Sequence, residues 1–447
     1  MRIFKFGGTS VETAERTRTV KDIINTTDQK IVVLSANGKA TDWLDGIISA
    51  LQKNNRVIFK NELARLRQFY DGYIQNLFRT EMYQVEAIHQ VNKILIDLEA
   101  LAFHTMKEQF IKSVLAKGEL ISTALFSLFL DECSISHIEL YAPDIIQKHE
   151  GGEVNLETTR LKLNQKMTQH PNYSLMIIQG FICSDHGGKL DNLGRGGSDY
   201  TATILGYASD AQEIQLWSDV DGFLSNDPGL VQNCFPLKQL SYYEAAELAY
   251  FGARILHPRS LFPAQHHNIP LRLKNTLNPK AKGTLISSQT QKGNIKAVAG
   301  KDGITSITIH SGRMLMAYGF LKSLFQVFEV YKTPVDMVTT SEVSVSVTID
   351  DKSNIDNILT DLRKMGEVEV RTDMSIVCVV GDQLTDNKGQ VSRIFQTLDC
   401  IPVRMISYGA SKNSITFLVD KNNKAQTMLS LQSLIPNLTM QNLSYVL

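Results

Sequence analysis

Near the N-terminus, a lysine is followed closely by two glycines, and these are residue types that bind phosphate. Lys5 lies in a short apolar run, and Gly7 and Gly8 separate this run from an expected helix. Adjacent glycines let backbone N–H groups approach phosphate oxygens, and the start of a helix adds positive potential. Lys5 could then neutralise charge on a phosphoryl group in transfer. The residue order is not that of a Walker A motif, and a glycine pair after a strand is by itself more often a tight turn.

A second glycine-rich loop, LGRGGSD from Leu193 to Asp199, also leads into an expected helix. Its Arg195 could bind a carboxylate through two parallel hydrogen bonds. Asp199 or Ser198 could cap the helix. Asp199 could instead take part in catalysis, and for Asp199 alone the sequence favours these two roles about equally. Two anion-binding loops in one domain would suit an enzyme that holds a triphosphate and an acidic acceptor together.

Three further groups of residues are weak evidence for a functional site when each is taken alone. Ser218 and Asp219 begin a stretch that contains Asp-Gly, which ordinarily marks a turn. Glu119 is a lone acid in a helical region, where a solvated surface residue is the usual case. His266 and His267 have no Cys or acidic partner at ligand spacing, so we predict no metal site.

The segments that would position these residues alternate between strand-like and helix-like over residues 1–275. Short β-branched runs that are apolar on both faces favour a mostly parallel sheet covered by helices. The strand candidates are Lys30–Ser35, Ser174–Cys183, Glu213–Trp217 and Pro270–Leu273. Residues 56–132, Tyr200–Ala208 and Ser241–Leu256 are expected to be helical. The predicted fold class is an α/β sandwich, in a catalytic domain of residues 1–275.

Residues 276–294 are polar and are interpreted as a linker, and an internal repeat follows them. PVDMV begins at Pro334 and PVRMI at Pro402, and an amphipathic helix precedes and follows each. The pattern predicts two β-α-β-β-α-β units, the first from about 311–388 and the second from about 295–310 and 389–447. A doubled unit of this kind could be regulatory or purely structural.

Length and composition narrow the class of protein. The 447 residues exceed one ordinary domain, and 46 Lys plus Arg balance 46 Asp plus Glu, so neither nucleic acid nor an anionic membrane is the expected partner. No apolar run approaches bilayer length, and the N-terminus lacks a signal-peptide layout. The five cysteines are an odd number without close pairing, which indicates reduced thiols and a cytoplasmic setting.

Together these motifs resemble the aspartate kinase family, within the amino acid kinase fold. The resemblance spans nearly the whole chain, and the order and spacing of the motifs are far more specific than any one motif. The matching stretches are KFGGTSV at Lys5, VVLSA at Val32, GELIS at Gly118, LGRGGSDYTA at Leu193, WSDVDG at Trp217, EAAELAYFGARILHP at Glu244 and IPLRLKNT at Ile269. The C-terminal repeat resembles the tandem ferredoxin-like ACT units of the monofunctional, lysine-sensitive type.

The resemblance implies a reaction and a set of site residues. ATP would phosphorylate the side-chain carboxylate of L-aspartate, as the first step in making lysine, threonine and methionine. Lys5 would stabilise the phosphoryl transition state, and Asp199 would orient Lys5. The aspartate-binding residues would be Ser35, Thr41, Glu119, Arg195 and Ser198, with Glu119 on the α-ammonium and Arg195 on a carboxylate. The ATP-binding residues would be Lys5, Gly7, Gly8, Ser218, Asp219, Leu224 and Arg254. Mg²⁺ would arrive with ATP and bind largely through phosphate oxygens and water, with no tightly bound cofactor.

The chain departs from the family pattern mainly around the nucleotide. Leu224 stands where the family usually has Tyr, Gly229 where it has Arg, and Arg254 where it has Lys. Arginine keeps the charge of lysine but changes its geometry. Weaker ATP binding with unchanged phosphoryl chemistry is therefore expected. Two other departures are Asp191-Asn192 in place of Thr-Thr before LGRGG, and Gly38-Lys39 after LSA.

A difference between the two repeats predicts where an effector would bind. The first PVxM stretch carries Asp336, which could bind an ammonium, and the second carries Arg404, which would repel one. The alternative is that both are exposed charges at strand ends. The resemblance favours inhibition by L-lysine, bound by Met314, Gly319, Phe320, Leu321, Asp336, Thr339, Thr340, Ser341 and Glu342. Ala317 stands where lysine-sensitive relatives tend to have Ser, so reduced affinity is expected.

Two other functions remain open at this point. One is a non-catalytic amino-acid sensor that kept the fold, favoured only by Leu224 and Gly229. The other is a kinase of the same fold that acts on another acid, such as glutamate or acetylglutamate. Sheet-edge pairing of the repeats predicts a homodimer, with a tetramer as the further alternative.

Overall fold

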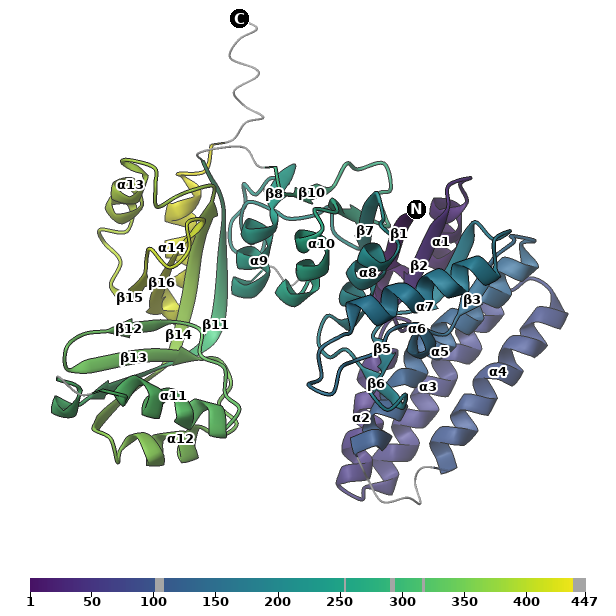
Figure 1. Cartoon of the computed structure of the whole chain (residues 1–447), viewed down its shortest axis with the longest axis horizontal. Helices are drawn as coiled ribbons and strands as arrows, with labels where there is room; N and C mark the ends of the chain where they lie inside the picture. Colours follow the sequence, from purple (N-terminus) through teal and green to yellow (C-terminus); the bar gives the residue numbers. More distant parts are fainter. Residues whose placement is uncertain (101–107, 253–254, 290–293, 316–317, 437–447) are drawn as a thin grey trace, which may run out of the picture. The chain divides into compact units, whose positions relative to one another are not determined.

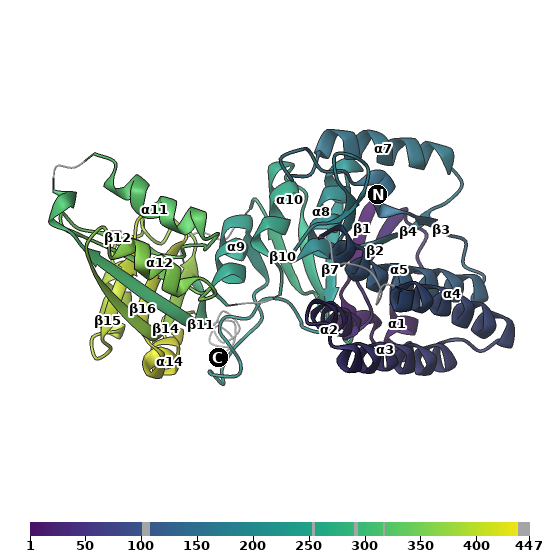
Figure 2. The ribbon, with the colours of Figure 1, turned by 90° about the horizontal axis from the view of Figure 1, so that it is seen from below.

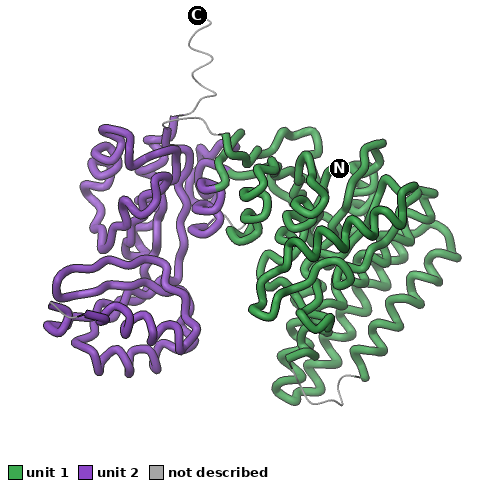
Figure 3. The backbone as a smooth tube through the Cα atoms, viewed as in Figure 1, with its two compact units in different colours: residues 1–223, 238–242, 255–289 green, residues 224–237, 243–254, 290–447 purple. Residues whose placement is uncertain are grey.

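The computed structural model describes residues 1–100, 108–252, 255–289, 294–315 and 318–436. The chain forms two compact units (Figure 3). Unit 1 comprises residues 1–223, 238–242 and 255–289, and unit 2 comprises residues 224–237, 243–254 and 290–447. Residues 224–237 and 243–254 therefore group with the C-terminal unit although they lie within the predicted catalytic domain. The domain boundaries drawn from the sequence stay a prediction.

Unit 1 is built on an eight-stranded sheet with the order β3-β4-β2-β1-β7-β9-β10-β8 (Figure 1). Its strands are β1 Arg2–Phe6, β2 Lys30–Leu34, β3 Ile138–Leu140, β4 Leu175–Gln179, β7 Glu213–Ser218, β8 Gln239–Ser241, β9 Leu271–Asn275 and β10 Thr284–Ser287. All neighbours pair in parallel except β9 and β10. The fold class predicted from the sequence is confirmed.

Two details of this sheet differ from the sequence prediction. The run Ser174–Cys183 is not one strand, because the chain turns at Gly180 and Phe181, where Phe181 has a φ of 65°. The second part of the run, β5 (Ile182–Ser184), forms a hairpin with β6 (Leu190–Asn192). The predicted linker, residues 276–294, also contains β10, which pairs with both β9 and β8.

Five helices of the described residues share a core with one face of this sheet, and Figures 1 and 2 show the long ones side by side. They are α1 Ala14–Ile24, α2 Ala40–Gln52, α3 Arg56–Leu77, α4 Glu81–Ala100 and α5 Glu108–Glu132. Their apolar faces form one core with Phe4 and Phe6 of β1 and with Val32 and Leu34 of β2. Burial of this continuous apolar surface is what holds the layer on the sheet.

Helix α5 corrects one expectation about length. By length and composition it could cross a membrane, contrary to the expectation that no apolar run approaches bilayer length. However, 61% of its most apolar window is buried inside the structure, and core helices pass the same test.

Helix α8 (Gly197–Ala208) packs on the opposite face, close to β1 and β7. Gly206 permits this approach, since a Cβ there would lie 2.5 Å from the Ile214 side chain. Side chains alternate between the faces of a strand, so Lys5 points to the α8 side while Phe4 and Phe6 point away. The helices α6 (Ala142–Ile145), α7 (Leu156–Gln169) and α10 (Phe262–His266) complete unit 1.

Unit 2 contains a six-stranded antiparallel sheet with the order β12-β13-β11-β14-β16-β15. The strands are β11 Ile295–His310, β12 Val338–Thr340, β13 Ser344–Ile349, β14 Glu367–Gly381, β15 Val403–Ser407 and β16 Ser414–Asp420. The helices are α9 Tyr242–Phe251, of which Tyr242 belongs to unit 1, α11 Phe320–Val330, α12 Ile355–Leu362, α13 Gln390–Thr397 and α14 Lys424–Gln432.

The two long strands β11 and β14 divide this sheet into two halves with separate cores. In the first half, α11 and α12 pack on β13 and the end of β11, and Figures 1 and 2 show these helices next to each other. The second half packs α13 and α14 on β16 and on the other ends of β11 and β14. The β11–β14 register shifts between Lys301 and Ile304, at the junction of the halves. The doubled unit predicted from the repeat is thus present.

Candidate functional site

The parallel strands of unit 1 bring several predicted site residues to one edge of the sheet. Gly7 follows β1, Ser35 follows β2, and Ser218 ends β7, and these three strands are neighbours in the order β2-β1-β7. The carboxyl ends of parallel strands meet at the same edge, which is where open α/β sheets place their ligands. In the sheet, β2 lies on one side of β1 and β7 lies on the other. The order of the strands therefore reverses direction at β1, and this edge includes the point of reversal.

Lys5 and Asp199 form an ion pair at this edge, with 2.6 Å between Lys5 Nζ and Asp199 Oδ1. Both side chains are largely buried, at 13% and 12% exposed. Asp199 does not cap α8, because the N-cap position is Gly196 and no side chain caps the helix. The helix begins at Gly197, so Asp199 lies in its first turn, and the cap interpretation was wrong for Asp199 and Ser198.

Of the two glycines after β1, Gly7 lies beside the Lys5 ammonium and Gly8 lies against the segment after β2. The Gly7 N–H donates to the carbonyl of Trp217 at 3.0 Å, and a Cβ on Gly7 would lie 3.7 Å from Lys5 Nζ. A Cβ on Gly8 would lie only 2.8 Å from the Ala36 carbonyl oxygen. Residues 8–11 then form a 3-10 turn, not the α-helix expected directly after the glycines, and α1 follows it.

Glu119 of α5 is buried, contrary to the usual surface position of a lone glutamate. Its Oε1 accepts a hydrogen bond of 3.3 Å from the Ala36 N–H, in the segment after β2. Gly118 makes this approach possible, since a Cβ there would lie 2.7 Å from Ala36 Cβ. Burial raises the pKa of Glu119 to about 8, although the Ala36 N–H and the nearby Lys5 ammonium act in the opposite direction. The site therefore holds a buried carboxyl group that forms no ion pair with the described residues.

The loop before α8 presents an arginine next to this pair. Arg195 is exposed, and its side chain makes no hydrogen bond or ion pair with the described residues. Gly194 and Gly196 on either side of it have φ values of 73° and 70°, which favour glycine. Ser198 faces Gly180, where a Cβ would lie 2.5 Å from Ser198 Oγ. Beside the loop, burial and the Arg195 charge lower the pKa of His257.

Other predicted residues of this site make no direct contact with the Lys5–Asp199 pair in the described residues. Thr41 and Asp219 are exposed, Ser35 is half-buried, and Ser218 Oγ accepts a weak hydrogen bond of 3.4 Å from the Val220 N–H. Leu224 belongs to unit 2, where it bridges to Pro236. Arg254 lies outside the described residues, as does Ala317.

The predicted effector residues all lie in unit 2, around the start of α11 and the ends of β12. Gly319 is the N-cap of α11 with a φ of 86°, and the turn after β12 is closed by Ser341 and Ser344. The exposed residues of the set are Gly319, Leu321, Thr339, Thr340, Ser341 and Glu342, and Met314 and Phe320 are half-buried.

Asp336 is not an exposed charge at a strand end. Its side chain is 1% exposed, and Oδ1 accepts hydrogen bonds from Lys301 Nζ at 3.0 Å and from the Tyr250 hydroxyl at 2.5 Å. Lys301 also pairs with Asp350 at 2.8 Å and lies 4.7 Å from the centre of the Tyr250 ring. The other oxygen, Oδ2, has no partner among the described residues. Burial, followed by the hydrogen bond to Asp336, raises the pKa of Tyr250. In the second repeat, Arg404 instead pairs with Asp420 on the surface.

Sequence reasoning did not find Tyr250 or Lys301, nor a cluster formed by Lys112, Lys148 and Asp191. Both lysines contact the Asp191 carboxylate at 2.9 Å. The only sequence signal for this cluster was Asp191-Asn192 in place of the usual Thr-Thr. No sequence signal connected Lys301 with Asp336, 35 residues away.

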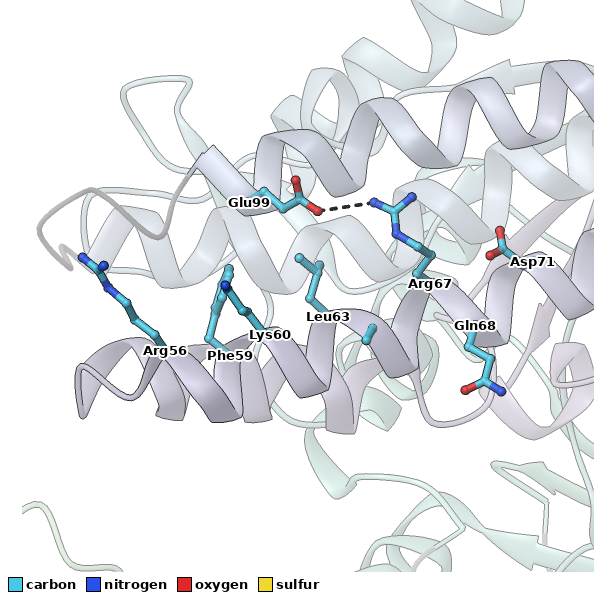
Figure 4. Close-up of a pocket in the computed structure, with 9 residues that line it drawn as sticks. Arg56, Phe59, Lys60, Leu63, Arg67, Gln68, Asp71 and Glu99 are labelled. Carbon is cyan, nitrogen blue, oxygen red and sulfur yellow. Dashed lines mark hydrogen bonds and ion pairs between the residues drawn. The ribbon is translucent and has the colours of Figure 1, made fainter.

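Two other features lie apart from the predicted site residues. The part of the chain that the structure describes contains no group of three or more His, Cys, Asp or Glu side chains able to hold a metal. A cavity of about 690 Å³ lies along α3, lined by Phe59, Leu63 and Arg67, with Glu99 of α4 paired to Arg67 at its rim (Figure 4). None of the predicted site residues lines it.

A mostly parallel α/β sandwich with a lysine, two glycines and an acid at its carboxyl edge is the arrangement expected of an amino acid kinase. Residues 1–275 match the amino acid kinase family, and residues 377–433 match the ACT domain. Among curated proteins the chain is similar to lysine-sensitive aspartokinase 3 of Escherichia coli, at 31% identity over 96% of this chain and 98% of that protein. It is also 32% identical to chloroplastic aspartokinase 1 of Arabidopsis thaliana, over 94% of this chain and 77% of that protein.

Solved structures agree with these relatives. The crystal structure of E. coli aspartokinase III with aspartate and ADP, in the R-state, matches with a TM-score of 0.85 at 30% identity, over 97% of this chain and 99% of that one. The structure of the same enzyme with lysine and aspartate, in the T-state, matches with a TM-score of 0.80 over the same shares. The chain belongs to the aspartokinase family and is therefore an aspartate kinase.

Proposed function

We propose that the protein transfers the γ-phosphoryl group of ATP to the side-chain carboxylate of L-aspartate, giving 4-phospho-L-aspartate. The observation that carries this proposal is the Lys5–Asp199 pair at the carboxyl edge of the sheet, beside two glycines and a buried glutamate. The E. coli relative was crystallised with aspartate and ADP, which supports the same pair of ligands here. The product would enter the biosynthesis of lysine, threonine and methionine.

Each residue has a distinct role in this proposal. Asp199 holds the Lys5 ammonium towards the transferring phosphoryl group, where a cation stabilises charge that develops in the transition state. Gly7 and Gly8 line the phosphates, and Ser218 and Asp219 contact the nucleotide. Mg²⁺ arrives with ATP and is bound largely by phosphate oxygens and water.

The aspartate pocket is proposed to hold the substrate at two points. Glu119 accepts the α-ammonium, and Arg195, whose side chain has no partner in the described residues, binds a carboxylate through parallel hydrogen bonds. Ser35, Thr41 and Ser198 complete the pocket. Two fixed anchors set the distance to the reacting oxygen, and this distance would exclude the longer glutamate.

A coupled assay of ADP release tests this function directly. Aspartate, glutamate and acetylglutamate are compared as acceptors, each with and without L-lysine. We expect ADP release with aspartate only, reduced by lysine. Release with another acid would replace the substrate proposal, and no release with any acid would favour the non-catalytic sensor.

The nucleotide is expected to bind weakly. Leu224 and Gly229 cannot supply the aromatic face and the cation that the family usually places against ATP. The KM for ATP should therefore be high or ATP and GTP poorly distinguished, and Leu224→Tyr should lower the KM for ATP by roughly three- to tenfold, as expected for about 1 kcal/mol of stacking. Leu230→Tyr, at an exposed position in the same segment, is the matched control. An unchanged KM in Leu224→Tyr would show that another residue meets the base.

We also propose that L-lysine inhibits the enzyme by binding in the first half of the unit 2 sheet. A relative named lysine-sensitive and a T-state structure with lysine support this. Asp336 would bind an ammonium of the effector, and Oδ2 is an acceptor without a partner in the described residues. Backbone groups near Gly319 would meet the effector carboxylate. The lysine-bound form would have low activity, because an effector favours the state that it binds better.

Asp336→Ala should abolish inhibition and leave uninhibited turnover nearly unchanged, as measured from kcat at zero and at millimolar lysine. Lys301→Met should act in the opposite sense, because the Lys301 ammonium already occupies one oxygen of Asp336 and competes with the effector. A typical coupling of about 1–3 kcal/mol corresponds to roughly 5–150-fold in affinity. Asp420→Ala, which breaks an exposed pair in the other half, is the control. A wild type insensitive to millimolar lysine would refute the regulatory proposal and leave the kinase proposal standing.

The remaining partners are proposed on the family alone. We propose a homodimer formed through the ACT units, with a tetramer as the alternative, in the cytoplasm. Sedimentation velocity with and without lysine would distinguish the assemblies.

A further inference from the structure

The Asp191 carboxylate is buried in unit 1 and has a cation on each oxygen. Asp191 is 6% exposed as a residue. Lys112 Nζ lies 2.9 Å from Oδ1, and Lys148 Nζ lies 2.9 Å from Oδ2. The Asn192 N–H also donates to Oδ1 at 2.8 Å. A carboxylate with so many partners stays ionised: burial opposes ionisation, but the hydrogen bonds from the two lysines outweigh it and lower the pKa of Asp191.

These contacts join three separate segments. Asp191 lies on β6, Lys112 lies in the first turns of α5, and Lys148 lies between α6 and α7. Lys148 also donates to the Asn192 carbonyl at 2.6 Å, and Gln109 of α5 donates to the Leu190 carbonyl at 2.6 Å. Strand β6 is therefore attached to α5 in two ways, through the Asp191 side chain and through the Leu190 backbone carbonyl.

The segment that β6 leads into is the loop that carries Arg195. The Asn192 side chain accepts a hydrogen bond of 3.2 Å from the Gly194 N–H, and the Leu193 N–H donates to the Phe181 carbonyl at 2.8 Å. Arg195 itself has no side-chain partner in the described residues, so its position depends on the backbone that leads to it. Among the described residues, the nearest ion pairs on the N-terminal side of Arg195 are the two at Asp191.

The same cluster also contacts the helix that carries Glu119. Lys112 and Glu119 are seven residues apart on α5, which places them on the same side of the helix two turns apart. The Lys112–Asp191 ion pair thus connects the helix of one proposed aspartate anchor to the loop of the other.

We propose that Asp191, together with Lys112 and Lys148, fixes the separation between Glu119 and Arg195 and so acts as a positioning residue for aspartate binding. This inference rests on the proposed function of these two anchors. A buried carboxylate held by two lysines is costly to desolvate and is weak evidence for added stability. A positioning role gives this arrangement a purpose that an apolar contact could not serve, since ion pairs and hydrogen bonds fix direction and distance.

The experiment compares Asp191→Asn with the wild type for both substrates. An amide keeps the shape of the carboxylate, but its NH₂ group would face a lysine ammonium, so one of the two contacts is lost. We expect the KM for aspartate to rise roughly tenfold or more, with the KM for ATP changed less than about twofold, because misplacement of an anchor affects the substrate it holds. Hydrogen exchange of the amides of residues 193–197 should become faster.

Matched variants separate positioning from stability. Lys148→Gln should reproduce the rise in the KM for aspartate, and Lys148→Arg should bring this KM most of the way back to the wild-type value. Asp210→Asn removes an exposed partner of Arg160 in the same unit and should change neither KM. An unchanged KM for aspartate in Asp191→Asn would overturn the proposal. Equal rises in the KM for aspartate and the KM for ATP, together with a lowered melting temperature, would also overturn it. If the wild type released no ADP with aspartate, the proposed function itself would fail, and the exchange rates of residues 193–197 would still report on the cluster.

Discussion

Lys5→Met should lower kcat by about 10²-fold or more, because it removes the cation aimed at the developing charge of the phosphoryl group. The Lys5 ammonium is 2.6 Å from Asp199 and next to Gly7, so the substitution removes this cation from the edge where the phosphates are proposed to bind. The KM for aspartate should change much less. The melting temperature should fall by no more than about 4 °C, the shift expected for about 1 kcal/mol in a unit of this size.

The matched control is Lys30→Met on the neighbouring strand. Lys30 is a buried lysine of β2 whose ammonium donates to the carbonyls of Ile24 and Thr26. Its loss should reduce stability and leave kcat nearly unchanged, which is the opposite of the result for Lys5. Near-normal turnover of Lys5→Met in a steady-state assay would contradict the assignment of this site.

Glu119→Gln should reduce kcat/KM for aspartate by roughly 10²-fold, since a buried ammonium would lose its charged partner. ATP binding, measured by calorimetry, should be almost unaffected. Glu139→Gln is the control, because Glu139 is another acid whose pKa is raised by burial, and it contacts Gln179, outside the proposed pocket. If aspartate use and ATP binding were weakened equally, Glu119 would be a structural residue.

The raised pKa of Glu119 gives the same variant a second signature, in stability. The pKa is about 8 in the folded chain, against an ordinary 4.5. Between these pH values the folded state keeps a proton that the unfolded state has lost, so this group makes the free energy of unfolding fall as pH rises from about 4.5 to 8. Glutamine has no such proton. Glu119→Gln should therefore be more stable than the wild type at pH 8.5 and equally stable near pH 4, as measured by urea denaturation.

Binding of an ammonium requires the ionised form of Glu119. The kcat/KM for aspartate in the wild type should consequently rise with pH up to about 8, and proton release should accompany binding below that pH. Glu119→Gln should lack this dependence. A pH profile that is the same in both proteins would contradict the proposed contact with the substrate ammonium.

The sequence by itself determined the fold class, the family and most of the strands and helices. These features are local: apolar runs such as KIVVLS at Lys30 predict buried parallel strands, and the spacing of apolar residues in 56–132 predicts helices. The repeat of PVDMV and PVRMI indicated two similar units, because each copy carries its own pattern of apolar residues. Residue types also limited the chemistry, since only certain side chains can neutralise phosphate or bind an ammonium.

The tertiary structure decided which charges meet and which are buried. Lys5 and Asp199 lie far apart in the chain, and they pair only because α8 packs on the face of β1 that Lys5 points to. Glu119 has an ordinary sequence context, and Gly118 and Ala36 together bury it. The sequence allowed Asp336 to be either an ammonium-binding residue or an exposed charge, and the fold buries it with Lys301 of strand β11 beside it. Asp191 pairs with Lys112 and Lys148, which come from two other segments of the chain. Long-range contacts of this kind depend on how the layers pack, and no local pattern of residues records them.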